Sequence, residues 1–230
     1  MLMLSPVLIL GLCGVLIARS ENLGMISSFA PTMGLGAIAL GLLSIAQLLQ
    51  NQFGLDREGF RAYVMSPVSR RDILLGKNLA TAPLGMGAGL VALVGLQILI
   101  PTDLPHFVGS CLQLPSAYML LCLVGNTISI LGPMRLRETN MRAANPSVKT
   151  ILWQILAVFL IPIVLTPLMI PGGVEFFLPD SGWTQVIPIY PAMHLIGLAL
   201  IVVLYRWGLA RQGELLQERE QRILELLTRA

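Results

Sequence analysis

Five polar side chains lie within long apolar runs of the sequence, at Gln97, Gln113, Asn126, Gln154 and His194. In apolar surroundings each unpaired donor or acceptor is costly, so such residues are candidates for function. Two interpretations stay open. Gln97, Gln113, Asn126 and His194 line a polar pathway for a substrate, or each residue hydrogen-bonds a neighbouring helix, which is the commoner role. The runs contain no Asp, Glu, Lys or Arg, which counts against a proton- or ion-driven transporter.

Chemistry catalysed by the chain itself has little support in the sequence. The two histidines, His106 and His194, form no recognisable pattern with a serine and a carboxylate. The phosphate-binding motif G-x-x-x-x-G-K-S/T is missing. The cysteines Cys13, Cys111 and Cys122 lie in apolar runs at spacings that match no zinc or haem motif. We therefore expect no enzyme activity, no metal and no cofactor in this chain, and an intramembrane enzyme is the weakest hypothesis.

The most distinctive charged stretch covers residues 51–78. Over residues 56–65 its apolar side chains Phe60, Tyr63 and Val64 recur at three- and four-residue spacing, which predicts a short amphipathic helix. Such a helix either lies on anionic lipid or passes force from a soluble partner to membrane-spanning helices. Residue spacing alone allows both roles.

The residues that follow predict a break and a second helix. Ser66-Pro67 ends the first helix, because the residue before a proline avoids the α region. Ser69 or Asp72 can then cap a helix that continues into the next apolar run. The charged stretch is thus expected to be ordered and joined directly to a membrane-spanning helix.

Composition indicates which elements position these residues. Of 230 residues, 55% are hydrophobic and 12% are charged, against roughly 25% charged residues in soluble domains. Six runs approach the roughly 20 apolar residues with which a helix crosses a bilayer. We expect an all-α, polytopic integral membrane protein with spans at Leu2–Ala18, Phe29–Leu49, Leu79–Ile100, Val108–Leu131, Ile151–Ile170 and Ile187–Tyr205.

The basic residues predict the orientation. All of the 15 Lys and Arg residues except Arg19 lie in the loops after the second and fourth spans or in the tail. Because cytoplasmic loops retain positive charge, both termini and these loops are expected in the cytoplasm. Dispersal of the basic residues between apolar runs argues against a nucleic-acid partner. Met1 opens directly into an apolar run, so the first segment is expected to stay as a membrane helix.

Prolines predict an irregular fifth span. Pro162 and Pro167 indicate a broken or re-entrant helix, which bilayer proteins tolerate when neighbours satisfy the freed carbonyls. The run Pro171-Gly172-Gly173 is expected to end that helix. Residues 174–178 could then form a short half-helix that dips back into the outer leaflet.

The tail predicts a separate cytoplasmic element. Residues 208–230 repeat an apolar face and carry charge around it, which predicts an amphipathic helix. It could rest on the membrane, pack against a partner or pair with a second copy of the chain. We therefore divide the chain into a transmembrane domain, residues 1–207, and this tail. The apolar face consists of Leu209, Leu216, Ile223 and Leu227.

The string NQFGLDREGFRAYVMSPVSRRDILLGKNLA, which begins at Asn51, resembles the loop between the second and third helices of permease subunits of bacterial type-2 ATP-binding-cassette (ABC) exporters. The six expected spans and the helical tail are similar to the same family, so the resemblance covers most of the chain. The residues that carry it are Asn51, Phe53, Gly54, Asp56, Gly59, Phe60, Ser66, Pro67, the Arg70-Arg71 pair and Gly76-Lys77-Asn78.

The resemblance implies a function and partners. A permease of this family lies in the bacterial inner membrane, pairs with a second permease copy or paralogue, and docks through a coupling helix in this loop on a separate ABC ATPase that binds the ATP. Family members usually have an amphipathic helix before the first span, which this chain lacks, so it is expected to be a fragment or the C-terminal half of a larger permease. The implied docking residues are Asp56, Glu58, Phe60, Arg61, Tyr63, Arg70 and Arg71.

Two hypotheses for the function follow from the sequence. The first is an ATP-driven permease, which the resemblance makes an exporter. The second is a membrane scaffold or assembly factor whose basic loops hold a partner without any use of ATP. Addition of a candidate ATPase separates them, because only a permease would stimulate ATP turnover and be driven by it.

Overall fold

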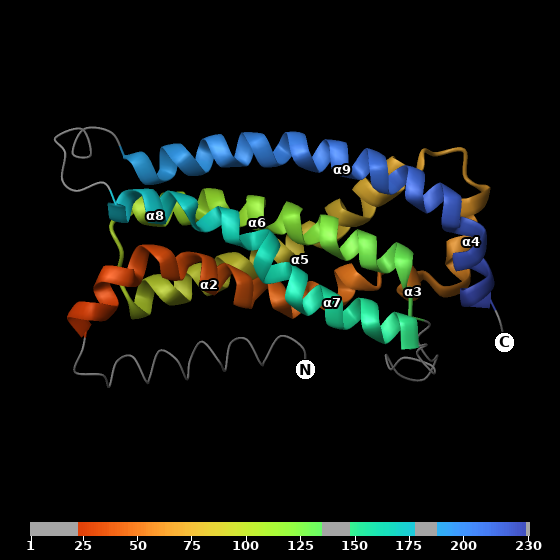
Figure 1. The fold of residues 1–230 in the computed structure, drawn as a ribbon, viewed down its shortest axis with the longest axis horizontal. Coiled ribbons are helices and arrows are strands. Elements are labelled where there is room, and N and C mark those ends of the chain that lie inside the picture. The colour runs from red at the N-terminus through yellow and green to blue at the C-terminus, as the bar shows by residue number, and fades with distance from the viewer. Residues whose placement is uncertain (1–22, 135–147, 178–187, 229–230) are drawn as a thin grey trace. The chain divides into compact units, whose positions relative to one another are not determined.

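The computed structural model describes residues 23–134, 148–177 and 188–228 (Figure 1). Every regular element in these ranges is a helix, as expected for an all-α protein. The first expected span, Leu2–Ala18, lies outside the described residues. The second to sixth expected spans each overlap a helical segment long and apolar enough to cross a membrane: Met33–Gln50, Arg70–Leu99, Leu104–Leu131, Val148–Glu175 and Ile189–Leu227.

The helices form two compact units. The first contains the described residues up to Ile45, Pro83–Met119 and Leu165–Val202, and the second contains Ala46–Ala82, Leu120–Val164 and the residues from Val203 onward. In chain order the elements are α2 (Leu23–Gln50), α3 (Gln52–Asp56), the 3₁₀ turn η1 (Arg57–Gly59), α4 (Phe60–Met65), α5 (Arg70–Leu99), α6 (Leu104–Leu131), α7 (Val148–Leu165), the 3₁₀ turn η2 (Thr166–Met169), α8 (Ile170–Phe177) and α9 (Ile189–Thr228).

α5 begins at Arg70, well before the expected start of the third span at Leu79. The backbone N–H of Asp72 donates to Ser69 Oγ at 3.2 Å, and that hydroxyl donates to Asp72 Oδ2 at 2.7 Å. This reciprocal cap satisfies a backbone donor that a helix start leaves free. The predicted cap is confirmed, and Pro83 lies within α5 without ending it.

Glycines allow close contact between helix backbones inside each unit. In the first unit, a Cβ at Gly41 of α2 would lie 2.7 Å from the carbonyl oxygen of Ala88 in α5. In the second unit, a Cβ at Gly125 of α6 would lie 2.9 Å from the carbonyl oxygen of Leu49 in α2. Small residues at such crossings are a main device for packing membrane helices.

The fifth span is broken, but not where the glycines predicted. α7 continues through Pro162, and η2 interrupts the helix near Pro167. The expectation that Pro171-Gly172-Gly173 ends the helix is wrong, because these residues lie inside α8. A proline in the first turn of a helix is tolerated, since its missing N–H would have no helical acceptor there.

A side chain of α6 donates a hydrogen bond to the backbone where η2 interrupts the fifth span. Gln113 Nε2 donates to the backbone carbonyl of Leu168 in η2 at 2.8 Å, and Gln113 is 1% exposed. Interruption of a membrane helix leaves carbonyls without a helical donor, and a side chain from a neighbouring helix can replace that donor. One of the polar residues singled out in the sequence therefore stabilises an irregular backbone.

α9 is continuous over 40 residues, so the sixth span and the tail form one helix. Gly213 of this helix lies against the backbone of Arg71 at the start of α5, where a Cβ would be 2.9 Å from the Arg71 nitrogen. The tail therefore packs on its own chain within the second unit, an arrangement that the sequence did not suggest. The predicted apolar face is at most 2% exposed at each of its members, Leu209, Leu216, Ile223 and Leu227.

Candidate functional site

Residues 51–69, which follow α2 and precede α5, form a small helical platform. Its centre is Phe60, which is 1% exposed and packs edge-on against Phe53 at 5.3 Å and against Tyr63 at 6.3 Å between ring centroids. The predicted amphipathic helix is present but begins at Phe60, after the turn η1. It ends at Met65, and Ser66 is extended before Pro67 as the sequence predicted.

Lys77 ties α5 to the platform. Its Nζ lies 2.5 Å from Asp56 Oδ2, and 5.4 and 5.2 Å from the ring centroids of Phe53 and Tyr63. The ion pair and the two cation–π contacts hold the Lys77 side chain against the platform. Burial raises the pKa of the Asp56 carboxyl, and the hydrogen bond and charge of Lys77 oppose that rise. Asp56 is therefore engaged within the chain.

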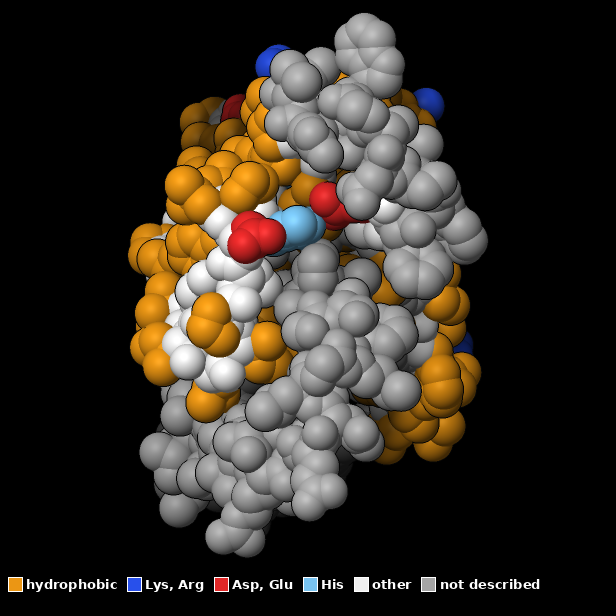
Figure 2. All heavy atoms as spheres, turned by 90° about the vertical axis from the view of Figure 1, so that its left-hand side faces the viewer, with side chains coloured by type: hydrophobic (Ala, Val, Ile, Leu, Met, Phe, Trp, Pro, Cys, Tyr) orange, Lys and Arg blue, Asp and Glu red, His pale blue; other side chains and the backbone are white. Residues whose placement is uncertain are grey.

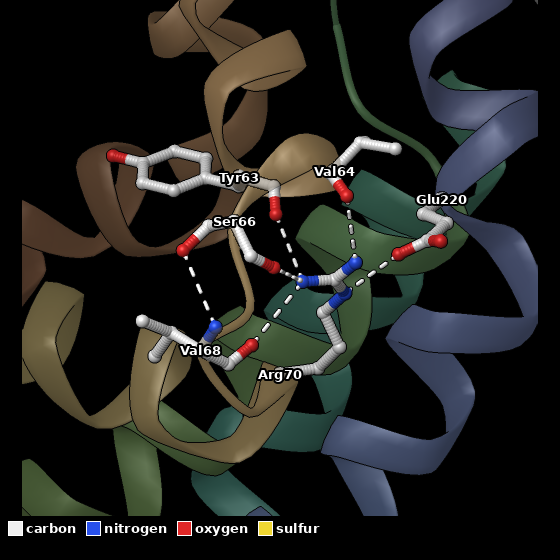
Figure 3. Close-up of polar contacts among 6 residues, drawn as sticks. All are labelled: Tyr63, Val64, Ser66, Val68, Arg70 and Glu220. Carbon is white, nitrogen blue, oxygen red and sulfur yellow. Dashed lines mark hydrogen bonds and ion pairs between the residues drawn. The ribbon is translucent and has the colours of Figure 1, made fainter.

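Arg70 closes the end of α4 and joins it to α9 (Figure 3). Its Nε donates to Glu220 Oε2 of α9 at 2.6 Å. A single guanidinium thus satisfies carbonyls that a helix end leaves unpaired and forms a charge-assisted bond with a distant helix. The two Nη groups donate to backbone carbonyls at 2.8 to 3.3 Å, those of Tyr63, Val64, Ser66 and Val68.

A buried network of amides joins α3, α5, α6 and α9 in the second unit. Gln52 Nε2 donates to Asn78 Oδ1 at 3.1 Å and to Asn126 Oδ1 at 3.2 Å. Asn78 Nδ2 donates to the Tyr205 hydroxyl at 2.8 Å, and Asn126 Nδ2 donates to Gln212 Oε1 at 3.1 Å. All five residues are at most 9% exposed. In such surroundings each hydrogen bond is strong and fixes the orientation of the next amide.

The first residues of the platform are also bonded to α6 and to Met134, which follows its end. Asn51 Nδ2 donates to the Met134 carbonyl at 2.9 Å, and the Met134 N–H donates to Asn51 Oδ1 at 2.7 Å. The Phe53 N–H donates to Ser129 Oγ at 3.1 Å. The platform is therefore attached to α5, α6 and α9 by specific polar bonds.

The opposite side of α4 is exposed. Glu58 of η1 and Arg61, Ala62 and Met65 of α4 recur at three- and four-residue spacing, and all four are exposed whereas Phe60 is buried. Met65 is 73% exposed. Methionine and arginine are enriched on surfaces that bind other proteins, whereas glutamate and alanine are depleted there, so Met65 and Arg61 are the members of this set that favour a docking role. We call these residues the outer face of α4.

The outer face contains only part of the set that the sequence suggested. Glu58 and Arg61 lie on it. Ala62 and Met65 were missed, although a helical projection opposite Phe60 would have found them. The other expected docking residues are largely buried or bonded within the chain: Asp56, Phe60, Tyr63, Arg70 and Arg71.

The expected polar-pathway residues are divided between the two units. Asn126 belongs to the amide network of the second unit, whereas Gln97, Gln113 and His194 lie in the first unit. Gln97 closes the end of α5, because its Nε2 donates to the Thr102 carbonyl at 2.8 Å and its Oε1 accepts from the Thr102 N–H at 3.2 Å. Gln97, Gln113 and Asn126 thus each bond to a helix end, a broken helix or another amide.

Both histidines join one cluster in the first unit. His106 Nε2 lies 2.9 Å from Glu175 Oε2, and Tyr190 packs against the rings of His106 at 5.0 Å and His194 at 4.6 Å. Figure 2, a view of the left-hand side of Figure 1, shows a histidine next to acidic side chains, with hydrophobic side chains around them. Spacing gave no signal for Glu175 or Tyr190, because α6, α8 and α9 are far apart in the chain. Among the described residues, no three His, Cys, Asp or Glu gather closely enough to hold a metal.

Comparisons with protein-family models, with curated proteins and with solved structures find no match to this chain. Function is therefore inferred from the residues themselves. The features used for that inference are the helices long and apolar enough to cross a membrane, the anchored platform and the outer face of α4.

Proposed function

We propose that this chain is a membrane-spanning permease subunit of an ATP-driven ABC transporter, an exporter, coupled through its platform to a separate ATP-binding subunit. The observation that carries the proposal is the two-sided character of α4. Phe60 and the Arg70 cap hold one side to the chain, while Glu58, Arg61 and Met65 are exposed on the other. A helix fixed on one side and bare on the other suits the binding of a soluble partner.

The anchors supply a route for force. Lys77 joins the platform to α5, Gln52 joins it to α6, and the pair of Arg70 with Glu220 joins it to α9. Arg70 bonds the carbonyls at the end of α4, and Lys77 and Gln52 hold the adjoining α3, so a displacement of the platform would be passed to the attached helices. Closure of the partner on ATP would press on α4 and change the packing of α5 and α9.

The basic loops support the orientation that this function needs. In the proposed topology of six spans, including Leu2–Ala18, the platform and the tail face the cytoplasm of a bacterial inner membrane. The partner binds the ATP, because the sequence has no phosphate-binding loop. A second permease copy or paralogue completes the pathway across the membrane.

Reconstitution tests this proposal. The chain is co-expressed with a candidate ATP-binding subunit, and the two are inserted together into vesicles. ATP turnover by that subunit is measured with and without the chain. We expect the chain to stimulate turnover, Arg61→Glu to abolish most of the stimulation, and Arg222→Glu, an exposed charge reversal in the tail, to leave it intact. Stable association without any effect on ATP turnover would instead support the membrane scaffold.

A further inference from the structure

An apolar groove runs along the second unit between α6, α7 and α9, with a volume of about 360 Å³. Its walls are formed by side chains such as Leu120 and Val124 of α6, Leu156 and Leu160 of α7, and Leu204 of α9. All three helices belong to segments long and apolar enough to cross a membrane, so in the proposed topology the groove opens toward lipid.

One end of the groove has the residues of a membrane interface. Trp153 of α7 and Trp207 of α9 both line it. Each tryptophan has a basic residue four positions away on the same helix, Lys149 before Trp153 and Arg211 after Trp207. The Arg211 guanidinium lies 5.8 Å from the Trp207 ring centroid and also lines the groove. Tryptophan with Lys or Arg is typical of the headgroup level of a bilayer.

The length of the groove matches one leaflet. The lining of α7 runs from Trp153 to Val164, a rise of about 16 Å at about 1.5 Å per residue. Half of a hydrocarbon core of about 30 Å is about 15 Å. A chain that begins at the tryptophans would therefore reach the middle of the bilayer at the far end of the groove.

The polar groups beside the groove are already paired. Gln212 Nε2 donates to Thr127 Oγ1 at 2.9 Å and to the Leu123 carbonyl at 2.6 Å. An apolar occupant can thus lie over Thr127 and Gln212 without leaving these donors and acceptors unsatisfied. The positive charge is at the interfacial end, where a lipid carries its phosphate.

We propose that the groove binds an acyl chain of an anionic phospholipid whose phosphate is held at Arg211, with Lys149 adding positive charge nearby. Arg211 also contacts Glu214 Oε2 at 3.2 Å, but both side chains are more than 60% exposed, at 66% and 63%. Such a pair is weak and leaves the guanidinium free to bind phosphate. The charge of Arg211 and the length of the groove identify the occupant. Its binding requires no ATP-binding partner.

Tryptophan fluorescence tests the site directly, because two of the three tryptophans line it. Trp183→Phe leaves Trp153 and Trp207 as reporters. The full chain is placed in phosphatidylcholine vesicles that contain a minor fraction of either acyl-brominated phosphatidylglycerol or acyl-brominated phosphatidylcholine. We expect quenching at equal mole fraction to show about a fivefold preference for the anionic lipid.

Matched variants separate headgroup from chain. Arg211→Gln should remove the preference, whereas Arg206→Gln, an exposed arginine on α9 that does not line the groove, should keep it. Leu160→Phe should reduce quenching by filling the groove, and Ile163→Phe, 66% exposed and outside it, should not. Equal quenching by the two lipids, or a preference that survives Arg211→Gln, would overturn the proposal. So would quenching that depends on protein density and not on headgroup, which would indicate a second copy in the groove.

Discussion

Arg70 and Glu220, which lie 150 positions apart in the chain, form an ion pair of 2.6 Å. Their side chains are 14% and 17% exposed. Because the same guanidinium caps α4, a single residue attaches the platform to the last helix. The tail of α9 is thus part of the structure that holds the outer face of α4 in place.

Arg70→Ala should lower the free energy of unfolding by about 2 kcal/mol, because Glu220 and the α4 carbonyls lose a largely buried, charged partner. Arg70→Lys should recover only part of this loss, since an ammonium cannot match the planar guanidinium fork. Thermal unfolding in detergent measures both. The control is Arg61→Ala, an exposed arginine whose removal should change stability by less than about 0.5 kcal/mol. Equal effects at Arg70 and Arg61 would contradict the anchor.

The amide network predicts a contrast between two polar residues. Asn126→Ala should cost about 2 kcal/mol, because it removes the acceptor of Gln52 and the donor to Gln212. Gln154→Leu should be neutral or stabilising, because Gln154 Nε2 is buried and has no hydrogen-bond partner among the described residues. Unfolding of the two variants under one condition checks this. A larger loss at Gln154 would contradict the assignment of the network.

Some features of the fold and of the candidate site could be predicted from the sequence, and others could not. The five apolar helices that overlap the second to sixth expected spans were predictable, and so was the Ser69–Asp72 cap, because run length, apolarity and caps are local properties. The bond that joins the end of α4 to α9 was not, because Glu220 lies 150 positions from Arg70 and carries no local signal. Periodicity likewise predicted the apolar face of the tail, but it did not predict that this face packs on the tail's own chain.

The histidine cluster shows a second reason why some site residues were not predicted from the sequence. His194 was noticed because a polar residue in an apolar run is conspicuous, but Glu175 and Tyr190 were not. The break at η2 brings α8 next to α6, and one-dimensional spacing cannot show which helices meet after such a break. The same limit explains why the burial of Phe60, which was expected to contact a partner, was not predicted.

The Asp56 carboxyl predicts a pH dependence of stability. Its pKa is raised, so between the ordinary value of 3.8 and the raised pKa the folded state holds a proton that the unfolded state has released. Stability from this group is therefore present at low pH and lost as pH rises through that window. The melting temperature of the wild type minus that of Asp56→Asn should fall across the window and then level off. A difference that is constant, or that grows with pH, would contradict the burial of Asp56.

Helix packing predicts opposite outcomes for two glycines. Gly41→Ala should destabilise the chain by about 1 to 3 kcal/mol, because the new methyl would meet the backbone of Ala88 and Gly89, which cannot rotate away. Gly87→Ala meets nothing within 4 Å and should be neutral or stabilising by up to about 1 kcal/mol. Thermal unfolding of both variants in one detergent decides the matter. Equal tolerance at the two positions would argue against the close contact of α2 and α5.

The central claim is that the outer face of α4 binds an ATP-binding subunit, and site-specific photocrosslinking tests it most directly. A photoreactive residue is placed at Met65 and, as a control, at Leu79, which is 62% exposed on α5 but lies outside the platform. The account predicts a covalent product with the co-expressed subunit from position 65 only, and loss of that product in Arg61→Glu. A complex that forms but crosslinks equally at both positions, or not at all at position 65, would contradict it.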